Sequence, residues 1–178
     1  MSRYEQPEYE IVGDCDEYEI RRYRSYLVAE TRVQGGFEST GNVAFQRLAG
    51  FIFGRNSRSE KMNMTVPVTH LPEADGAHRY RFVMERTYTE ETLPRPVDDT
   101  VDIVRVPGAH LAASRYRGGR GEARFNRATA RLLSALERDG VEVTGPAQAA
   151  VYDGPFVPPP LRRNEVLVPV AWLGVRDG

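Results

Sequence analysis

Cysteine is nearly absent from the sequence, since Cys15 is the only one among 178 residues. A single cysteine excludes an internal disulfide framework and a zinc site built from cysteines. No apolar run approaches the roughly 20 residues that a membrane-spanning helix needs. The first residues, MSRYEQPEYE, are too polar for a secretory signal. We therefore expect a cytoplasmic protein without membrane insertion.

A strong net charge is lacking as well. The 24 Lys and Arg residues nearly balance the 25 Asp and Glu residues, which leaves a net charge of −1. Nucleic acid or an anionic membrane is therefore not expected as a partner. Lysine is almost missing, because Lys61 stands beside 23 arginines. Arginine suits forked contacts with carboxylates, although a bias toward arginine codons explains the excess equally well.

Motifs for nucleophilic catalysis or phosphate binding are not found. The chain has no G-x-S-x-G nucleophile elbow, and its glycine-rich stretch RYRGGRGEARF lacks the Lys-Ser/Thr pair of a phosphate-binding loop. His70, His78 and His110 follow none of the spacings of histidine metal motifs. The metal ligand, if there is one, is unassigned, and His70 is a weak candidate.

His70 ends the stretch EKMNMTVPVTH, which has the composition of a strand over residues 60–70 and holds two of the four methionines. Alternation along a strand places Met62 and Met64 on one face with His70, and Lys61 on the other. Methionine and histidine are both axial ligands of haem iron. Methionine is more often a filler of irregular core space, so we expect Met62 and Met64 to pack in the core.

Hydrophobic periodicity predicts two helices and several strands. The first helix covers residues 42–54, with Ser39 or Thr40 as its N-cap and Gly54 at its end, and the second lies within residues 121–140. The buried stripe of the first helix is expected to contain Phe45, Leu48, Ala49 and Ile52. The predicted strands span residues 18–33 (one bent strand or two short ones), 60–70, 79–85, 101–116 (with a break at Pro107-Gly108), 145–154 and 164–172.

The two halves of the chain repeat each other. At an offset of 111 − 27 = 84 residues, Leu27 matches Leu111, Leu48 matches Leu132, and residues 82–84 match residues 166–168. One offset that aligns a strand, a helix and a later strand indicates two units with the order β-α-β-β.

The repeat predicts an α+β fold. Each unit would cover one face of its strands with a helix, and a pseudo-two-fold axis would join the units into a distorted antiparallel β-barrel or sheet flanked by two helices. We expect a single domain over residues 1–178, with internal halves at about 9–90 and 101–174. The junction of the halves is a natural place for a concave site.

The segment YDGPFVPPPLRRNEVLVP combines stiffness, apolar side chains and positive charge. Its prolines fix the backbone, so ordering it costs little entropy. Phe156 and Leu161 are apolar, and Arg162 and Arg163 follow at once. Such a loop suits a flat amphiphile that carries carboxylates, or it is a strand entry whose arginines are solvated. Glu165, in the last strand, either faces water or meets a cation in a pocket.

Four stretches and their order resemble the SOUL/haem-binding protein family, in particular its bacterial members. These stretches are YEIRRYRSYLVAET, AFQRLAGFIFGRN, EKMNMTVPVT and YDGPFVPPPLRRNEV, and the resemblance runs from about Tyr9 to Trp172. It implies a distorted antiparallel barrel with two helices. It also implies non-covalent binding of b-type haem or another porphyrin by a carrier, buffer or sensor, without a known catalytic reaction.

The resemblance also implies a binding cleft between the first helix and the proline-rich loop. Its residues would be Asn42, Phe45 and Ala49 on the helix and Phe156, Pro158 and Leu161 on the loop. Two basic positions of the family read Gly50 and Pro158 here, so Arg47, Arg162 or Arg163 would have to meet the propionates. Arg22 stands where some members carry an iron-ligating histidine, and we therefore expect low affinity.

Two other roles stay open. The two-unit pattern resembles gyrase-inhibitor-like small-molecule-binding domains, some of which are hydrolases, and there Glu165 would serve with Tyr152 or Tyr80 nearby. A low-dielectric pocket would raise the pKa of Glu165 and make it a general acid or base. The remaining possibility is a protein-interaction role in which haem binding is incidental.

Overall fold

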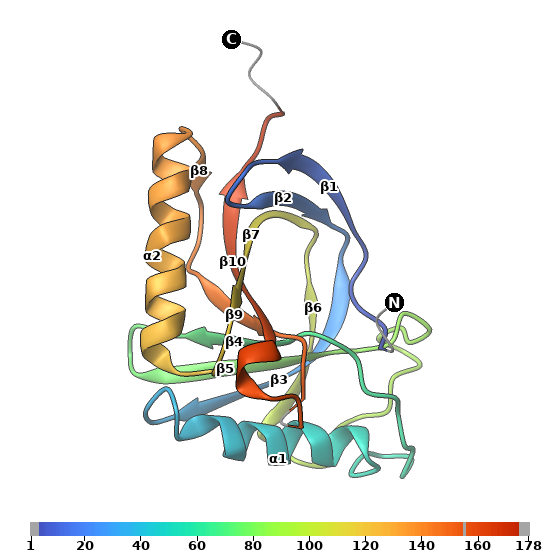
Figure 1. Cartoon of the computed structure of the whole chain (residues 1–178). Helices are drawn as coiled ribbons and strands as arrows, with labels where there is room; N and C mark the ends of the chain where they lie inside the picture. The colour runs from blue at the N-terminus through green and yellow to red at the C-terminus, as the bar shows by residue number, and fades with distance from the viewer. Residues whose placement is uncertain (1–3, 155, 175–178) are drawn as a thin grey trace. The chain divides into compact units, whose positions relative to one another are not determined.

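The computed structural model describes residues 4–154 and 156–174, and its ribbon is drawn in Figure 1. The chain forms two compact units. Unit 1 consists of Met1–Pro7 and Ser25–Pro107, and unit 2 consists of Glu8–Arg24 and Gly108–Gly178. Within the described ranges, no helix is long and apolar enough to cross a membrane.

Unit 1 is a four-stranded antiparallel sheet with one helix. The strand order is β6-β3-β5-β4, formed by Val101–Val106, Tyr26–Gln34, Ala77–Val83 and Val68–Pro72. Helix α1, Thr40–Ile52, packs on β3, β5 and β6. The buried side chains that join helix and sheet include Leu27, Ala29, Leu48, Phe51, Ile52 and Phe82. This face of the sheet is apolar because alternate strand residues point toward the helix.

Unit 2 is a larger antiparallel sheet with the second helix. The strand order is β1-β2-β7-β10-β9, formed by Tyr9–Asp14, Glu19–Tyr23, Ala109–Arg117, Arg163–Ala171 and Gln148–Val151. The short strand β8, Glu142–Val143, pairs with β10, and the 3-10 turn η1, Pro159–Leu161, precedes β10. Helix α2, Glu122–Arg138, packs on β7, β8 and β10.

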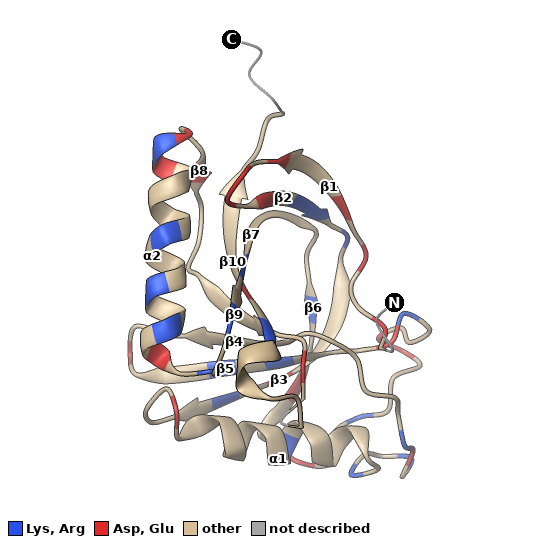
Figure 2. Cartoon of the chain, in the orientation of Figure 1, with Lys and Arg blue, Asp and Glu red and all other residues tan. Residues whose placement is uncertain are grey.

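Helix α2 is amphipathic, as the sequence predicts. Its buried residues are Phe125, Leu132, Ala135 and Leu136. Its exposed side carries Arg124, Arg127, Arg131 and Arg138, which appear as blue bands along the helix in Figure 2. Burial of the apolar stripe holds the helix on the sheet.

The predicted α+β class and the repeat of elements are confirmed. Unit 1 contains β3-α1-β4-β5 and unit 2 contains β7-α2-β9-β10, with the matching spatial orders β3-β5-β4 and β7-β10-β9. The offset of 84 does not hold through both strands, because it carries the pair Ala29↔Phe82 to Ala113 and Val166, whereas Ala113 pairs with Leu167. A slip of one residue exchanges the faces of a strand, so the repeat applies to elements and not to side chains.

The units exchange strands, so their bounds differ from the predicted contiguous halves. Strands β2 and β3 are separated by only two residues, Arg24 and Ser25, yet β2 pairs with β7 in unit 2. Strands β6 and β7 are separated by Pro107 and Gly108, yet β6 pairs with β3 in unit 1. Each short break therefore sends the chain from one unit to the other.

Two details of α1 differ from the expectation. Ser39 is the N-cap residue, but it makes no capping hydrogen bond, and its hydroxyl donates to the carbonyl of Gly36 instead. Leu48, Ala49 and Ile52 are buried as predicted, whereas Phe45 is 50% exposed. The apolar stripe of α1 is therefore narrower than the spacing of its apolar residues predicts.

The strand predicted over residues 60–70 is wrong for most of its length. Strand β4 begins only at Val68, and the segment before it makes one isolated bridge, Glu5↔Thr65. Pro67 has no N–H for a ladder, which explains why regular pairing starts after it. Met62 is buried in the core of unit 1 and Met64 packs against that core, as expected.

Candidate functional site

Unit 2 contains a buried polar cluster centred on Arg21 and Glu165. We call it the Arg–Glu–Tyr cluster, and it consists of Tyr9, Glu19, Arg21, Tyr23, Tyr152 and Glu165. Arg21 is 1% exposed and Glu165 is 2% exposed. Its members come from β1, β2 and β10 and from the residue after β9, and the antiparallel pairing of unit 2 holds these strands together.

The guanidinium of Arg21 uses both of its edges. Its Nη1 donates to Oε2 of Glu165 at 2.8 Å, and its Nη2 donates to Oε1 at 2.9 Å. Its Nε donates to Oε2 of Glu19 at 2.9 Å, and Nη2 lies 2.8 Å from the same oxygen. A fork that meets two carboxylates in this way is the geometry for which arginine is suited.

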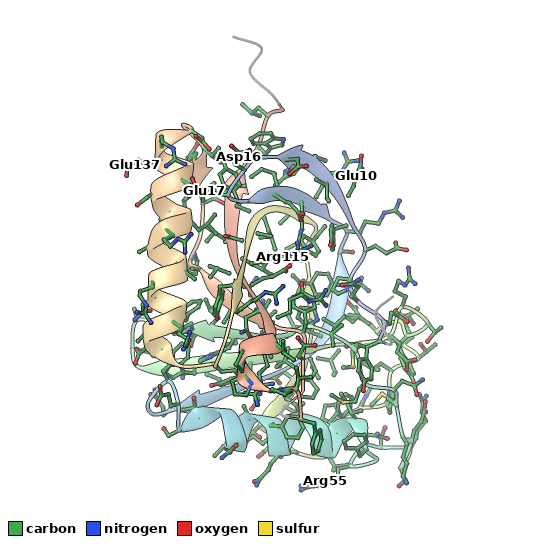
Figure 3. All side chains as sticks on the ribbon, in the orientation of Figure 1. Glu10, Asp16, Glu17, Arg55, Arg115 and Glu137 are labelled. Atoms are coloured by element: carbon green, nitrogen blue, oxygen red, sulfur yellow. The ribbon has the colours of Figure 1, made fainter. Side chains whose placement is uncertain are left out.

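Three tyrosines contact the Arg21–Glu165 pair. Tyr152 donates its hydroxyl to Oε2 of Glu165 at 2.7 Å, and the hydroxyl of Tyr23 accepts a hydrogen bond from Nη1 of Arg21 at 3.3 Å. The ring of Tyr9 lies 4.5 Å from the guanidinium carbon of Arg21. Arg115 on β7, labelled in Figure 3, places Nε 3.4 Å from Oε1 of Glu165, but its own side chain is 61% exposed.

Glu165 carries its charge in spite of burial. Burial would raise the pKa of this carboxyl, but the hydrogen bonds and charge of Arg21, together with the Tyr152 hydroxyl, lower it below its ordinary value. Burial also opposes the charge of Arg21, and Glu165 more than compensates, so the pKa of Arg21 is raised. Burial beside Glu165 raises the pKa of Tyr152, which keeps its hydroxyl a donor.

These facts correct the sequence-based picture of Glu165. Of the two tyrosines considered, Tyr152 is the one that bonds to Glu165, and the expected rise in the pKa of Glu165 is wrong. Tyr80, the other candidate, lies on β5 of unit 1, where its hydroxyl is 2.8 Å from that of Thr40. A carboxylate that accepts three hydrogen bonds and is nearly inaccessible is a poor general base.

Arg21 is the residue that sequence reasoning missed. It lies in YEIRRY, where Glu19, Arg21 and Tyr23 alternate on one face of β2 with the fully buried Ile20 between them. The signal available in the sequence was an arginine flanked by a glutamate and a tyrosine on the same face of a strand. What they could not reveal is the partner, since Glu165 is 144 residues away along the chain.

The α1 candidates lie in unit 1. Asn42 is exposed, Phe45 is 50% exposed with its ring 5.8 Å from that of Phe82, and Ala49 is buried at 7% exposure. Arg47 points to β3, where its Nη1 donates to the Thr31 hydroxyl at 3.2 Å and to a backbone carbonyl of the same strand. On α1, Asn42 and Phe45 are therefore available to a ligand, and Arg47 already has partners in its own sheet.

The loop candidates lie in unit 2. Phe156 is 97% exposed, Leu161 is 62% exposed and Pro158 is also exposed. Arg162 donates through Nε to the carbonyl of Val157 at 2.7 Å. The guanidinium carbon of Arg163 lies 4.4 Å from the ring of Tyr152. Pro155, one of the prolines that make this loop stiff in sequence, lies outside the described residues.

His70 is enclosed in unit 1. Its Nε2 lies 2.8 Å from Nδ1 of His78, and its ring stacks on Tyr80 and contacts Phe37, each at 4.3 Å between centroids. Burial, and then His78, lowers the pKa of His70 to about 4. His78, on β5, is itself buried at 7% exposure.

The surroundings of His70 and Arg22 bear on iron binding. The Nε2 of His70 is already engaged by His78, and the described residues hold no group of three or more His, Cys, Asp or Glu side chains that could bind a metal ion. Arg22 forms an exposed ion pair with Glu10. Phe45 in unit 1 and Phe156 and Leu161 in unit 2 are each exposed enough for apolar contact, whereas neither His70 nor Arg22 fits the role of an axial ligand.

Several solved structures share this fold. The EcmrR C-terminal domain has a TM-score of 0.67 and 11% identity, covering 92% of this chain and 98% of that one. A hydrolase from Listeria innocua has a TM-score of 0.63 and 14% identity, covering 87% and 92%. The protein SAV2435 bound to tetraphenylphosphonium has a TM-score of 0.53 and 13% identity, covering 88% and 95%. At such identities the likeness concerns the fold alone.

The sequence comparisons are more specific about the family. No curated protein matches the chain by sequence. The family described as SOUL heme-binding protein matches residues 4–169, which include both units, the Arg–Glu–Tyr cluster, α1 and the proline-rich loop. The chain therefore belongs to the SOUL heme-binding protein family.

Proposed function

We propose that this protein binds haem or a related tetrapyrrole non-covalently and acts as its carrier, buffer or sensor. Family membership supports this proposal. The observation that carries it is the exposure of large apolar side chains at the positions that the family resemblance assigns to the ligand: Phe45 on α1, and Phe156 and Leu161 on the loop. Single exposed apolar side chains are common on protein surfaces, so it is the position of these three in the family pattern that connects them with a ligand.

Apolar contact supplies the affinity in this proposal. Burial of a phenylalanine side chain contributes about 1.5–3 kcal/mol, so each of these side chains would add to the affinity for a flat apolar ring. The residues considered above add no bond to iron, because Arg22 is cationic and the Nε2 of His70 is engaged by His78. Bound haem would supply its characteristic absorption, which serves as a reporter.

The test compares haemin with metal-free protoporphyrin. Binding is followed by the Soret band and by quenching of the fluorescence of Trp172, the single tryptophan. We expect the two ligands to bind within a few-fold of each other, because the ring and not the iron carries the affinity. Phe45→Ser and Phe156→Ser should each weaken binding about tenfold, the equivalent of about 1.4 kcal/mol.

Matched controls are the exposed apolar residues away from these positions. Val97→Ser in unit 1 and Ile11→Ser in unit 2 remove side chains that are 63% and 50% exposed, and both should leave affinity unchanged. His70→Gln should also leave it unchanged. Absence of a Soret change and of quenching at micromolar protein would overturn the proposal.

The alternative role of Glu165, in a gyrase-inhibitor-like small-molecule-binding domain or hydrolase, has weaker support. Tyr152 does bond to Glu165, but Arg21 takes both carboxylate oxygens and the site is nearly inaccessible. Under this alternative Glu165→Gln would abolish ligand binding or turnover. Under the tetrapyrrole proposal a folded Glu165→Gln variant keeps the affinity for haemin.

A further inference from the structure

The guanidinium of Arg21 occupies surroundings that would suit an organic cation from outside the chain. One face of the guanidinium lies against the ring of Tyr9, 4.5 Å from its centroid. Its two edges meet Glu165 and Glu19 at 2.8–2.9 Å. An aromatic face together with carboxylates at the edges is the general chemistry by which proteins hold guanidinium and ammonium groups.

The enclosing groups are fixed independently of Arg21. Tyr9 is on β1, Glu165 is on β10, and Tyr152 follows β9. Strand β7 lies between β2 and β10 in the sheet, and Arg21 faces Leu111 of β7 across the ladder. The side chain of Arg21 therefore reaches past a neighbouring strand to Glu165, and the backbone pairs that hold β1, β7, β9 and β10 do not depend on it.

Without the guanidinium the enclosure would be strongly anionic. Among the residues that the structure describes, Arg115 would then be the cation left near Glu19 and Glu165, at 3.9 Å and 3.4 Å, and its side chain is 61% exposed. A buried carboxylate without a close cation costs several kcal/mol. Tyr152 adds one hydrogen bond to Glu165 but no positive charge. The enclosure thus has a strong requirement for a cation, and the sequence supplies one at position 21.

We propose that the Arg–Glu–Tyr cluster is an organic-cation site occupied by the chain's own guanidinium, and that Arg21 excludes external cations from Glu165. Guanidinium and its monoalkyl derivatives are the ligand class that would replace it. Arg21 thereby acts as a specificity-determining residue, since its presence prevents external cations from binding to Glu165. The proposal goes beyond tetrapyrrole binding and does not depend on it.

The experiment restores the missing cation to a truncated variant. Arg21→Ala should be destabilised, and millimolar guanidinium chloride should restabilise it relative to the same concentration of sodium chloride. At about ten times its dissociation constant, guanidinium should raise the folded-to-unfolded ratio about tenfold. The readout is unfolding in urea followed by Trp172 fluorescence and far-UV circular dichroism.

Three proteins give matched controls. The wild type should not respond, because Arg21 fills the site. The double variant Arg21→Ala/Glu165→Gln should not respond, because the carboxylate is gone. Arg105→Ala removes another strand arginine, whose side chain is 49% exposed and pairs with Glu90, and it should not respond either.

A variant that fails to fold still decides the question. If Arg21→Ala is unfolded in sodium chloride, dilution from urea into guanidinium must recover its folded fraction, while the double variant is unaffected by the choice of salt. Equal behaviour of Arg21→Ala in the two salts, folded or unfolded, overturns the proposal. An equal response of the wild type overturns it as well.

Discussion

The two units bury their polar groups in opposite ways. Unit 2 buries a charged pair, since the Arg21 and Glu165 side chains are 1% and 3% exposed. Unit 1 buries the imidazole of His70, whose Nε2 lies 2.8 Å from Nδ1 of His78 and whose pKa is lowered by burial to about 4. Unit 1 also has a carboxylate in its sheet, Glu30, whose side chain is 8% exposed. The partners of Glu30, Arg79 and Arg81, have side chains that are 29% and 24% exposed.

The difference lies in where each network ends. Glu30 accepts from Arg81 at 2.6 Å and from Arg79, and Arg79 also binds Glu73, whose side chain is 21% exposed. The chain of charges in unit 1 therefore reaches water. In unit 2 both members of the central pair are buried, and the network reaches water only through their outer partners, Glu19 at 25% and Arg115 at 61% exposure, among the residues described. Water therefore reaches both arginine partners of Glu30 directly, whereas it reaches neither Arg21 nor Glu165.

The largest expected loss of stability comes from breaking the buried pair of Arg21 and Glu165. Glu165→Gln leaves the Arg21 guanidinium buried with Glu19 as its remaining carboxylate, and it should lower the free energy of unfolding by about 3–5 kcal/mol. Urea unfolding measures it. The double variant Arg21→Met/Glu165→Leu should recover most of this loss, because it removes both charges together. If the losses in the free energy of unfolding of the two single variants simply add in the double variant, Arg21 and Glu165 do not act as a buried pair.

Burial of the His70 imidazole in unit 1 should make the free energy of unfolding depend on pH. The pKa of His70 is about 4 in the folded protein and 6.5 ordinarily. Between these values the unfolded chain binds a proton that the folded protein does not. The contribution of His70 to the free energy of unfolding is therefore at its maximum above pH 6.5. It falls as the pH drops toward 4, by at most about 3 kcal/mol. Urea unfolding at several pH values measures this slope.

Variants at two histidines separate this slope from general acid unfolding. His70→Gln keeps an amide that can meet His78 and should flatten the curve between pH 4 and 6.5. His110→Gln, on β7 of unit 2, is the matched control and should retain the slope. If both variants behave alike, the pH dependence does not originate in the His70–His78 contact.

A smaller effect is expected from the open network of unit 1. Glu30→Gln should lower the free energy of unfolding by about 1–2 kcal/mol, because Arg79 and Arg81 keep Glu73 and water as partners. Added salt should reduce this loss, since the pairs are partly exposed, while the loss in Glu165→Gln should be insensitive to salt. Equal salt sensitivity in the two variants would show that the units do not differ as described.

The smallest effect belongs to the surface of unit 2. Arg22 and Glu10 form an ion pair between β2 and β1 whose side chains are 59% and 64% exposed. Arg22→Ala should cost less than about 0.5 kcal/mol. Arg22 adjoins Arg21 in sequence, so the contrast between Arg22→Ala and Arg21→Ala isolates burial from residue type. A comparable loss in both would remove burial as the explanation.

Much of the fold was predictable from local pattern. The second helix, the break at Pro107-Gly108 and the repeated order of elements follow from periodicity and backbone chemistry. The strand over residues 60–67 was mispredicted because composition favoured it while Pro67 prevents regular pairing. Phe45 was placed in the core by its spacing, and only the packing of α1 on its sheet leaves it half exposed.

The site was predictable only in part, and for a physical reason. The sequence by itself determined the α+β class, the two-unit pattern and membership of a haem-binding family, but it left open whether Tyr152 or Tyr80 accompanies Glu165. Tertiary structure decided that β2 joins unit 2 and brings Arg21 to Glu165 across 144 residues. It thereby decided that Glu165 is a paired carboxylate rather than a proton carrier. A pKa is determined by the charges and solvent around a group, and those surroundings exist only once strands distant in sequence are paired.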